Sequence, residues 1–378
     1  MLAICSDLDE TPDLGSYLTL SRYLNTRDET AVGRGLGLET GNTLYFDMAP
    51  GDLSYWNTSD AGRDAIHALI RSGHIDCFHS FGDLASNRSH AARALDALAK
   101  HDCQLSVWVD HAVAPTNLGP DIMLGLGDVA DAAAYHADLT LAHGVRYVWL
   151  GRVSSCMGQD VHYSMATGLS QIRDGQSLMN TVKDATKVVR GAIGDPKYAL
   201  HWGNRLTRPY ELRSGQTVIE FMRCNPHPYG VSVGDDAAGL GSSLHPISMQ
   251  RLIDREGWCV LYTHLGKHLA GTDLLPIPAR KSLEALAQHH CRGEILVTTT
   301  RRLLDYSALI HKVSYVMKDN RLIVDSGGVD SSGLTFYGLQ PGQQIELNGQ
   351  TLQPQWNPVD HTARPSCSVP FKRLSYPL

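Results

Sequence analysis

Histidine and aspartate lie four residues apart in the stretch Gly73–Asp83, where His79 and Asp83 follow a short apolar run. Ser80 and Gly82 allow the chain to turn directly after His79, so both side chains are expected at the carboxyl end of a buried strand. Imidazole nitrogen and carboxylate oxygen are ordinary zinc ligands, and a catalytic zinc usually takes three protein ligands and leaves one position for water. The stretch therefore predicts half of a metal site. The alternative is structural, with His79 as a hydrogen-bonded core histidine and Asp83 as a helix cap.

Apolar runs that could position this site alternate with amphipathic runs along most of the chain. Eight apolar runs are predicted as strands: Leu2–Ser6, Thr43–Met48, Ile75–Phe81, Leu105–Val109, Val145–Leu150, Val218–Met222, Cys259–Thr263 and Glu294–Thr298. The runs between them are predicted as helices: Gly15–Leu24, Asp60–Ser72, Ser89–His101, Val129–His143, Gln176–Ile193, Ser248–Glu256 and Arg280–His290. This alternation favours parallel βαβ units. We therefore expect an α/β fold, as a (β/α) barrel of seven or eight strands.

Polar or ionisable residues follow nearly every predicted strand. In chain order they are Asp7, Asp9, Asp47, His79, Asp110, His111, Arg152, Arg223, Asn225 and His264. In a (β/α) barrel the carboxyl ends of all strands open into one site, so we expect these side chains to converge. A competing explanation is that polar residues follow strands in any protein, because loops are polar.

Two segments depart from the alternation. The connection over residues 154–196 is longer than ordinary α/β connections of roughly 2–6 residues, which predicts an insertion over the site or a lid. From residue 313 onward, short alternating runs are separated by turn residues, which predicts a small antiparallel β appendage over 313–378, after a barrel over 1–312. We expect the appendage to cap the barrel or to form a contact between copies of the chain. Its Ser326–Ser332 stretch resembles the pyrophosphate loop of N-type ATP pyrophosphatases, but strand-like residues follow it, so we predict a hairpin turn.

Composition excludes several classes of protein. The chain has 378 residues, is 43% hydrophobic and carries a formal charge of −6, and it shows no basic stripe of the kind that nucleic acid requires. No run reaches the roughly 18 apolar residues of a membrane span, and the first residues form no basic leader. We therefore expect a cytoplasmic protein without a membrane span. The eight cysteines are scattered and form no CxxC pair, which predicts buried thiols rather than disulfides.

The aspartates that follow the first strand fit two kinds of hydrolase. The acidic stretch Asp7–Thr11 resembles the first motif of haloacid-dehalogenase-type phosphatases. In that family the first aspartate attacks phosphorus, the second acts as acid and base, and magnesium bridges them. The family also needs a strand that ends in threonine, then a lysine and an acidic pair. Here the candidate acidic pair, Asp235 and Asp236, precedes the candidate threonine strand, which is the wrong order.

The segment Gly73-His74 followed by His79-Ser80 resembles the Gly-His-(four residues)-His-Thr/Ser segment of the family 4 carbohydrate esterases, the NodB-type polysaccharide deacetylases. In that family this segment supplies metal ligands from a barrel strand, and two aspartates on the first strand supply the base and another ligand. Asp7 and Asp9 occupy that place here. The chain departs from the family where Asp83 replaces its second histidine and where Asp110 and His111 replace its arginine motif. The resemblance spans roughly residues 2–300 in architecture but rests on these short motifs.

The resemblance implies a divergent deacetylase of the kind found in exopolysaccharide or O-antigen assembly. It would bind one divalent cation, expected to be zinc, through Asp9, His79 and either Asp83 or His111. Asp7 would be the general base, and His264 would protonate the leaving amine. Five further residues are expected to contact a sugar or polysaccharide substrate: Asp47, Asp110, Arg152, Arg223 and Asn225. The two arginines would indicate a carboxylate or phosphate on it.

Two other functions are kept open by the sequence. One is the haloacid-dehalogenase-like phosphatase that would use Asp7 and Asp9. The other is a non-catalytic, carbohydrate-binding subunit of a polysaccharide assembly complex, which would keep the ligands for binding alone.

Overall fold

The computed structural model describes residues 1–378 except 113, 162–171, 173–176, 232, 268–272, 341, 354 and 358–363. The described chain forms two compact units. The first comprises Met1–Arg301 and Tyr376–Leu378, and the second comprises Arg302–Ser375. The expected boundary between residues 312 and 313 therefore falls inside the second unit, and the last three residues belong to the first.

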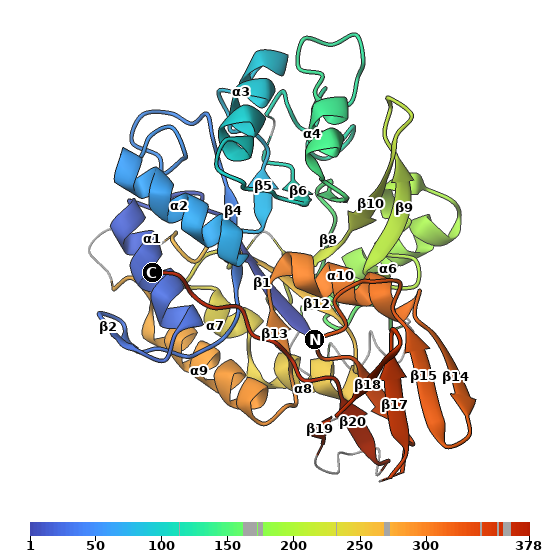
Figure 1. The fold of residues 1–378 in the computed structure, drawn as a ribbon. Helices are drawn as coiled ribbons and strands as arrows, with labels where there is room; N and C mark the ends of the chain where they lie inside the picture. The colour runs from blue at the N-terminus through green and yellow to red at the C-terminus, as the bar shows by residue number, and fades with distance from the viewer. Residues whose placement is uncertain are drawn as a thin grey trace. The chain divides into compact units, whose positions relative to one another are not determined.

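A curled, mostly parallel sheet forms the centre of the first unit (Figure 1). The strands of this unit are β1 (Leu2–Ser6), β2 (Glu29–Thr30), β3 (Gly33–Arg34), β4 (Gly41–Leu44), β5 (Cys77–His79), β6 (Val107–Val109), β7 (Tyr147–Trp149), β8 (Val153–Ser154), β9 (Thr207–Glu211), β10 (Thr217–Phe221), β11 (Arg223–Cys224), β12 (Cys259–Thr263) and β13 (Val297–Thr298). Ten of them pair in the order β8-β11-β12-β1-β4-β5-β6-β7-β10-β9, and β13 pairs with β1. All these pairs are parallel except β9 with β10. The predicted α/β class with parallel βαβ units is confirmed.

The prediction of a closed (β/α) barrel is wrong, because the sheet curls only into a half-barrel. Two short strands that the sequence did not indicate follow the predicted strands Val145–Leu150 and Val218–Met222. β7 ends before Gly151, whose φ of 88° turns the chain, and the two-residue β8 follows. Met222 separates β10, which pairs with β7, from β11, which pairs with β12. Strands of two residues contribute too little pairing to complete a regular barrel wall.

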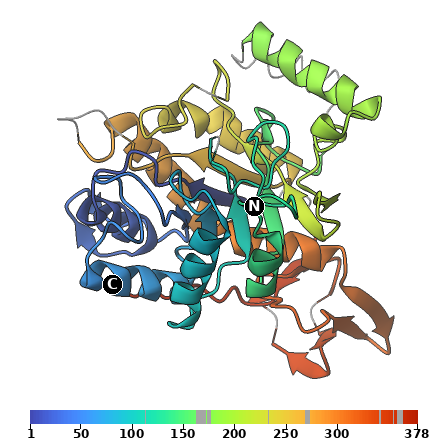
Figure 2. The same ribbon diagram turned by 90° about the horizontal axis from the view of Figure 1, so that it is seen from above.

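Helices lie outside the curled sheet (Figures 1 and 2). In the first unit they are α1 (Leu14–Asn25), α2 (Asp60–Ser72), α3 (Arg88–Ala99), α4 (Ala137–His143), α6 (Leu178–Ala192), the 3-10 turn η1 (Pro196–Tyr198), α7 (Leu240–Ser243), α8 (Pro246–Arg255) and α9 (Ile277–Cys291). The helix α10 (Thr300–Ile310) belongs almost entirely to the second unit. Side chains of Asp13, Ser59 and Asn87 cap the first turns of α1, α2 and α3, as short polar side chains do at helix starts. Buried apolar side chains on the helices then pack against the sheet in two clusters.

Two expected segments differ from the structure or lie partly outside it. The predicted helix Val129–His143 begins only at Ala137. Its first half is a packed loop in which the buried His136 bonds the backbone oxygen of Thr116, at 2.7 Å, and the hydroxyl of Thr140. Of the predicted insertion over 154–196, residues 162–171 and 173–176 lie outside the described residues, and α6 and η1 form much of the described part.

The second unit is built from short strands around its own small core. They are β14 (Ser314–Lys318), β15 (Arg321–Asp325), β16 (Thr335–Tyr337), β17 (Gln344–Leu347), β18 (Gln350–Leu352), β19 (Gln355–Trp356) and β20 (Ser366–Ser368). They form the sheets β14-β15-β17-β18 and β16-β20-β19. Because β15 and β17 are parallel, the unit is not wholly antiparallel as expected. Gly327 and Gly328 both have positive φ and a strand follows, so the Ser326–Ser332 stretch is a turn. It is not the predicted hairpin, because β15 and β16 belong to different sheets.

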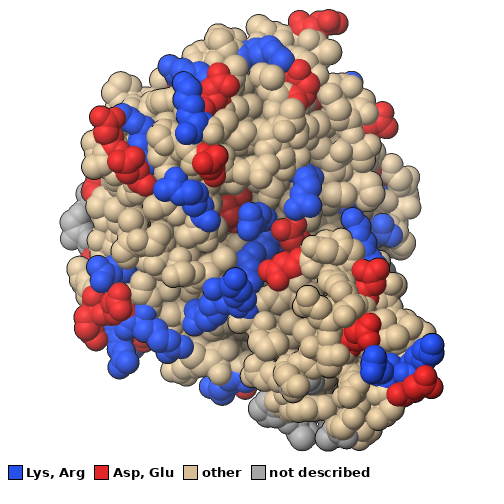
Figure 3. All heavy atoms as spheres, in the orientation of Figure 1, with Lys and Arg blue, Asp and Glu red and all other residues tan. Residues whose placement is uncertain are grey.

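The surface and the cysteines agree with the composition. Basic and acidic side chains are interspersed on the face shown in Figure 3. Among the described residues, no helix has the length and apolar character needed to cross a bilayer. All eight cysteines are free thiols, and all but Cys291 are buried, as predicted.

Candidate metal centre

A cavity of about 470 Å³ lies at the carboxyl ends of β1, β5, β6 and β12. This volume is in the range of roughly 300–1,000 Å³ that is typical of small-molecule sites. Seven of the residues predicted for the site line it: Asp7, Asp9, His79, Asp83, Asp110, His111 and His264. Four others do not: Asp47, Arg152, Arg223 and Asn225. The rule that strand ends converge therefore found the site, but not all of the residues assigned to it.

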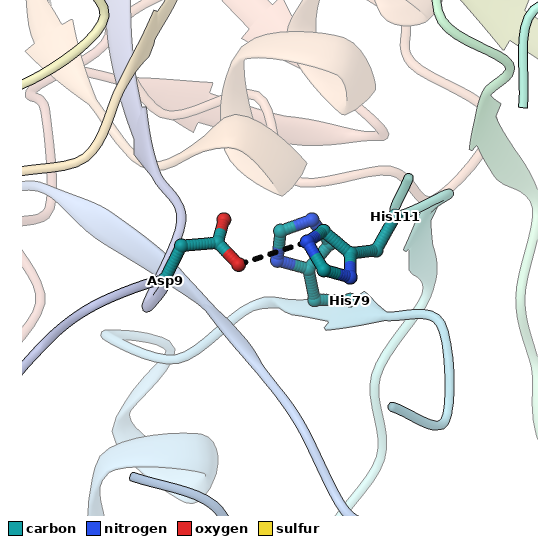
Figure 4. Close-up of side chains that lie close together, drawn as sticks. All are labelled: Asp9, His79 and His111. Atoms are coloured by element: carbon teal, nitrogen blue, oxygen red, sulfur yellow. Dashed lines mark ion pairs between the residues drawn. The ribbon is translucent and has the colours of Figure 1, made fainter. Parts of the chain in front are cut away.

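Five side chains present possible metal ligands to the cavity. Asp7 and Asp9 follow β1, His79 ends β5, His111 follows β6 and His264 follows β12. Asp9, His79 and His111 form one group whose ligand atoms all lie within 4.8 Å of one another, and Asp7, Asp9 and His264 form another. Figure 4 shows the first group, in which the Asp9 carboxylate faces the two imidazoles. Mixed imidazole and carboxylate sets of three are typical of catalytic zinc sites.

The backbone turns sharply after each residue of the first group. Glu10, Ser80 and Ala112, which directly follow the three ligands, have φ angles of 56°, 45° and 41°. Such left-handed conformations cost non-glycine residues about 1–2 kcal/mol each. Strain of this kind persists only where the surroundings enforce it, and it is concentrated at functional sites. Here it lets each strand end without carrying its ligand away from the cavity.

Each of the three histidines is held through Nδ1 and turns Nε2 towards the aspartates. The Nδ1 of His79 lies 3.1 Å from the Thr43 hydroxyl, and that of His264 lies 2.8 Å from the backbone oxygen of Asp235. The Nε2 atoms of His111 and His264 both lie 2.9 Å from Asp9, one from each carboxylate oxygen. Metal-binding histidines are generally oriented in this way by a partner on the other ring nitrogen.

Asp83, which the sequence offered as a ligand, instead orients His111. Its Oδ1 accepts a hydrogen bond from the Nδ1 of His111 at 2.7 Å. His111 is therefore the third member of the first group, and Asp83 contacts its far ring nitrogen. The sequence could not decide between the two, because the choice depends on how the loops after β5 and β6 meet.

Asp83→Ala is expected to weaken zinc binding by about 10–100-fold, since outer-shell partners of ligating histidines contribute that much. Asp83→Asn keeps an oxygen that can accept the bond from His111, so its zinc affinity should fall less than that of Asp83→Ala. Competition with a chromogenic chelator measures both affinities. An equal loss in the two variants would instead indicate that Asp83 binds the cation directly.

Asp7 is paired with an arginine beneath the cavity. Arg223, with no exposed surface, donates to both oxygens of Asp7 at 2.8 and 2.6 Å. Its guanidinium also stacks on Trp149 and Tyr262, 4.5 and 5.1 Å from the ring centroids. The structure does not support the expectation that Arg223 contacts substrate, because the guanidinium is buried, does not line the cavity and donates to Asp7 through both terminal nitrogens.

Two further residues assigned to substrate are also engaged inside the protein. Arg152 is bound by Asp121 at 2.8 Å and lies 3.2 Å from Glu220. The side-chain oxygen of Asn225 accepts a hydrogen bond from Ser243 at 2.8 Å. Both side chains are almost fully buried, so the structure does not support their assignment to substrate.

Asp47 and Asp110 have structural partners as well. Asp47 forms an ion pair with Arg93 and does not line the cavity. Asp110 lines the cavity but has no exposed surface, and it accepts bonds from the Trp108 indole and from the backbone amides of residues 118–119. Burial raises the pKa of Asp110 to about 7 despite these bonds. Its role is to hold the loop that follows β6.

Tyr45 is a site residue that sequence reasoning missed. Its hydroxyl donates a very short hydrogen bond to Asp9, and its ring stacks on His79 with centroids 4.4 Å apart. The sequence placed it within a predicted strand, Thr43–Met48, where tyrosine is an ordinary apolar residue. No spacing signal separates such a tyrosine from one that contacts a ligand.

The electrostatics of the cluster keep the aspartates ionised. Burial alone would raise the pKa values of Asp7 and Asp9, but Arg223 lowers that of Asp7, and the histidines lower that of Asp9. Burial lowers the pKa of His79 to about 4, so its imidazole is uncharged at neutral pH and one of the two ring nitrogens carries no proton. For His111, hydrogen bonds to Asp83 and Asp9 outweigh burial and raise the pKa to about 10. A cation that binds there must displace this proton.

Comparison with known proteins found no match among protein-family models, curated proteins or solved structures. The functional conclusion therefore rests on the chemistry of the site.

Proposed function

We propose that the protein is a metal-dependent hydrolase that removes an acyl group, most simply N-acetyl, from a sugar or polysaccharide during assembly of a cell-surface polysaccharide. One observation carries the proposal: three histidines, each held through Nδ1, turn Nε2 towards the buried Asp7 and the half-buried Asp9 in one cavity. This donor set suits zinc.

The residues present fit a single cation held by Asp9, His79 and His111. When bound, the cation would act as a Lewis acid and bring the pKa of water towards about 7. Asp9 would be oriented for this task by the Tyr45 hydroxyl. Asp83 would hold His111 in the tautomer that leaves Nε2 free to bind.

Asp7 and His264 would handle the protons. Asp7 is ionised and its Oδ2 lies 3.6 Å from His79 Nε2 and 3.9 Å from His264 Nε2, so it can accept a proton from attacking water. Burial lowers the pKa of His264, but hydrogen bonding to Asp9 and the charge of Asp7 raise it overall. His264 therefore carries a proton at higher pH than an ordinary histidine, as an acid for the leaving amine requires.

The phosphatase alternative is less consistent with the geometry. A haloacid-dehalogenase-type site binds magnesium, which takes oxygen ligands in preference to imidazole. That reaction also has no use for the histidines that surround Asp9. The non-catalytic alternative gains no specific support from the described residues.

The proposal predicts that the zinc-loaded protein releases amine from N-acetylated amino-sugar oligomers. A chelator should reduce release to background, and added zinc should restore it, because the cation is needed to activate water. Amine and acetate are both quantified, with phosphate release from sugar phosphates as the parallel assay. Release of phosphate that survives His79→Ala, without release of amine, would replace this proposal with the phosphatase.

A further inference from the structure

Apart from the histidines and the proposed cation, the described lining of the cavity offers little positive charge to an anionic substrate. The two arginines expected at its mouth, Arg152 and Arg223, are buried in ion pairs and do not line it. Among the described residues, Lys267 is the only lysine or arginine of the lining, and its Nζ lies 2.8 Å from Glu10. In the described part of the chain, no arginine lines the cavity to bind a carboxylate, sulfate or phosphate group in a bidentate way.

Carboxylates dominate the lining instead. They are Asp7, Asp9, Glu10, Asp52, Asp83, Asp110 and Asp235. Arg223 neutralises Asp7 and Lys267 neutralises Glu10. Four carboxylates, those of Asp9, Asp52, Asp83 and Asp235, outweigh the combined charge of a bound dication and a protonated His264, so the cavity would keep a negative charge after metal loading. Low-dielectric walls focus such a field inside a cleft.

The rest of the lining is apolar or aromatic. Met48, Leu53, Met123, Trp149 and Tyr262 contribute to the walls. Flat aromatic and thioether surfaces suit the CH face of a sugar ring. The apolar walls of the cavity can therefore pack against a sugar ring, while its carboxylates place the substituents of that ring in a negative electrostatic field.

We propose that this site, in its proposed function as a deacylase, selects substrates by charge. It accepts neutral or cationic acylated amino sugars and rejects those with a carboxylate, sulfate or phosphate inside the cavity. Asp52 and Asp235 determine this specificity. Asp52 is an exposed wall residue, and Asp235 lies beside His264, with 3.7 Å between its Oδ2 and Nδ1. Like charges placed together disfavour the wrong partner more strongly than any single contact favours the right one.

Calorimetry on the zinc-loaded, full-length protein tests this selection with three probes. They are a neutral disaccharide of N-acetylglucosamine, its cationic de-N-acetylated form, and an anionic disaccharide of N-acetylglucosamine and glucuronate. The cationic probe should bind most tightly, and the anionic probe about 10-fold or more weakly than the neutral one. High salt should narrow the differences, because screening weakens charge interactions. Equal binding of the anionic and neutral probes would overturn the proposal.

Two variants test whether Asp52 and Asp235 cause this charge selection. Asp52→Asn and Asp235→Asn should each reduce the neutral-to-anionic affinity ratio several-fold, because each removes one repelling charge. Asp96→Asn is the matched control, since Asp96 is an exposed carboxylate on α3 that does not line the cavity. An unchanged ratio in both wall variants, or an equal change in Asp96→Asn, would contradict the assignment to these residues.

The same measurements separate this inference from the proposed function. If the protein prefers cationic over anionic probes but releases no amine, the proposed deacylase function is contradicted and the charge selection is not. Release of amine together with equal binding of all three probes would support the deacylase and contradict the charge selection.

Discussion

His79→Ala is expected to abolish stoichiometric zinc binding and to reduce amine release to background. His79 is almost fully buried, its Nδ1 is held by Thr43, and its Nε2 belongs to the group formed with Asp9 and His111. Loss of a direct ligand should exceed the roughly 10–100-fold cost of losing an outer-shell partner. Elemental analysis after dialysis against limiting zinc measures the metal content of each variant.

His74→Ala is the matched control for this experiment. His74 is also buried and lies near His79 in the chain, but its Nδ1 is bound to Ser72 and it does not line the cavity. Burial lowers its pKa to about 4, much as for His79. Truncating it should lower stability and leave the zinc content unchanged. Full zinc content in His79→Ala would show that the site is misplaced.

The sequence located the site because strand periodicity fixes where strands end. His79 ends a short buried strand, Asp9, His111 and His264 each follow one, and parallel strands place their carboxyl ends together. Strand periodicity could not predict the pairing of Asp83 with His111. It depends on the left-handed Ser80 and on the following loop, which periodicity does not describe.

The direction of a side chain at a strand end was the main source of error. Arg223 does follow an apolar run, as read from the sequence. The interruption at Met222, however, makes Arg223 the first residue of β11 and turns its guanidinium under the site instead of into the mouth. A residue shift of one reverses the face of a strand, so such errors are expected wherever a strand breaks.

Arg223→Met is expected to destabilise the folded protein by about 3–5 kcal/mol at neutral pH, since it leaves a buried carboxylate without its partner. Asp7 and Arg223 are both almost fully buried, and the arginine holds the pKa of Asp7 below its usual range. Methionine keeps much of the packing against Trp149 and Tyr262, so the loss should come mainly from charge. Urea unfolding followed by tryptophan fluorescence measures the difference.

The pH dependence and a double variant separate charge from packing. In the wild type, the depressed pKa of Asp7 adds stability above the usual carboxyl range near pH 4, and this stability is lost as the pH falls through that range towards the folded-state pKa. In Arg223→Met, burial should raise the pKa of Asp7, so stability should fall as the pH rises from about 4 to 7. The difference between the two proteins should therefore be largest at neutral pH. Asp7→Asn combined with Arg223→Met removes both charges and should recover much of the loss, because replacing a whole buried pair is often nearly neutral. A double variant as unstable as Arg223→Met, with a difference that does not depend on pH, would mean that Arg223 stabilises the strand junction by packing and that the ionised state of Asp7 has another cause.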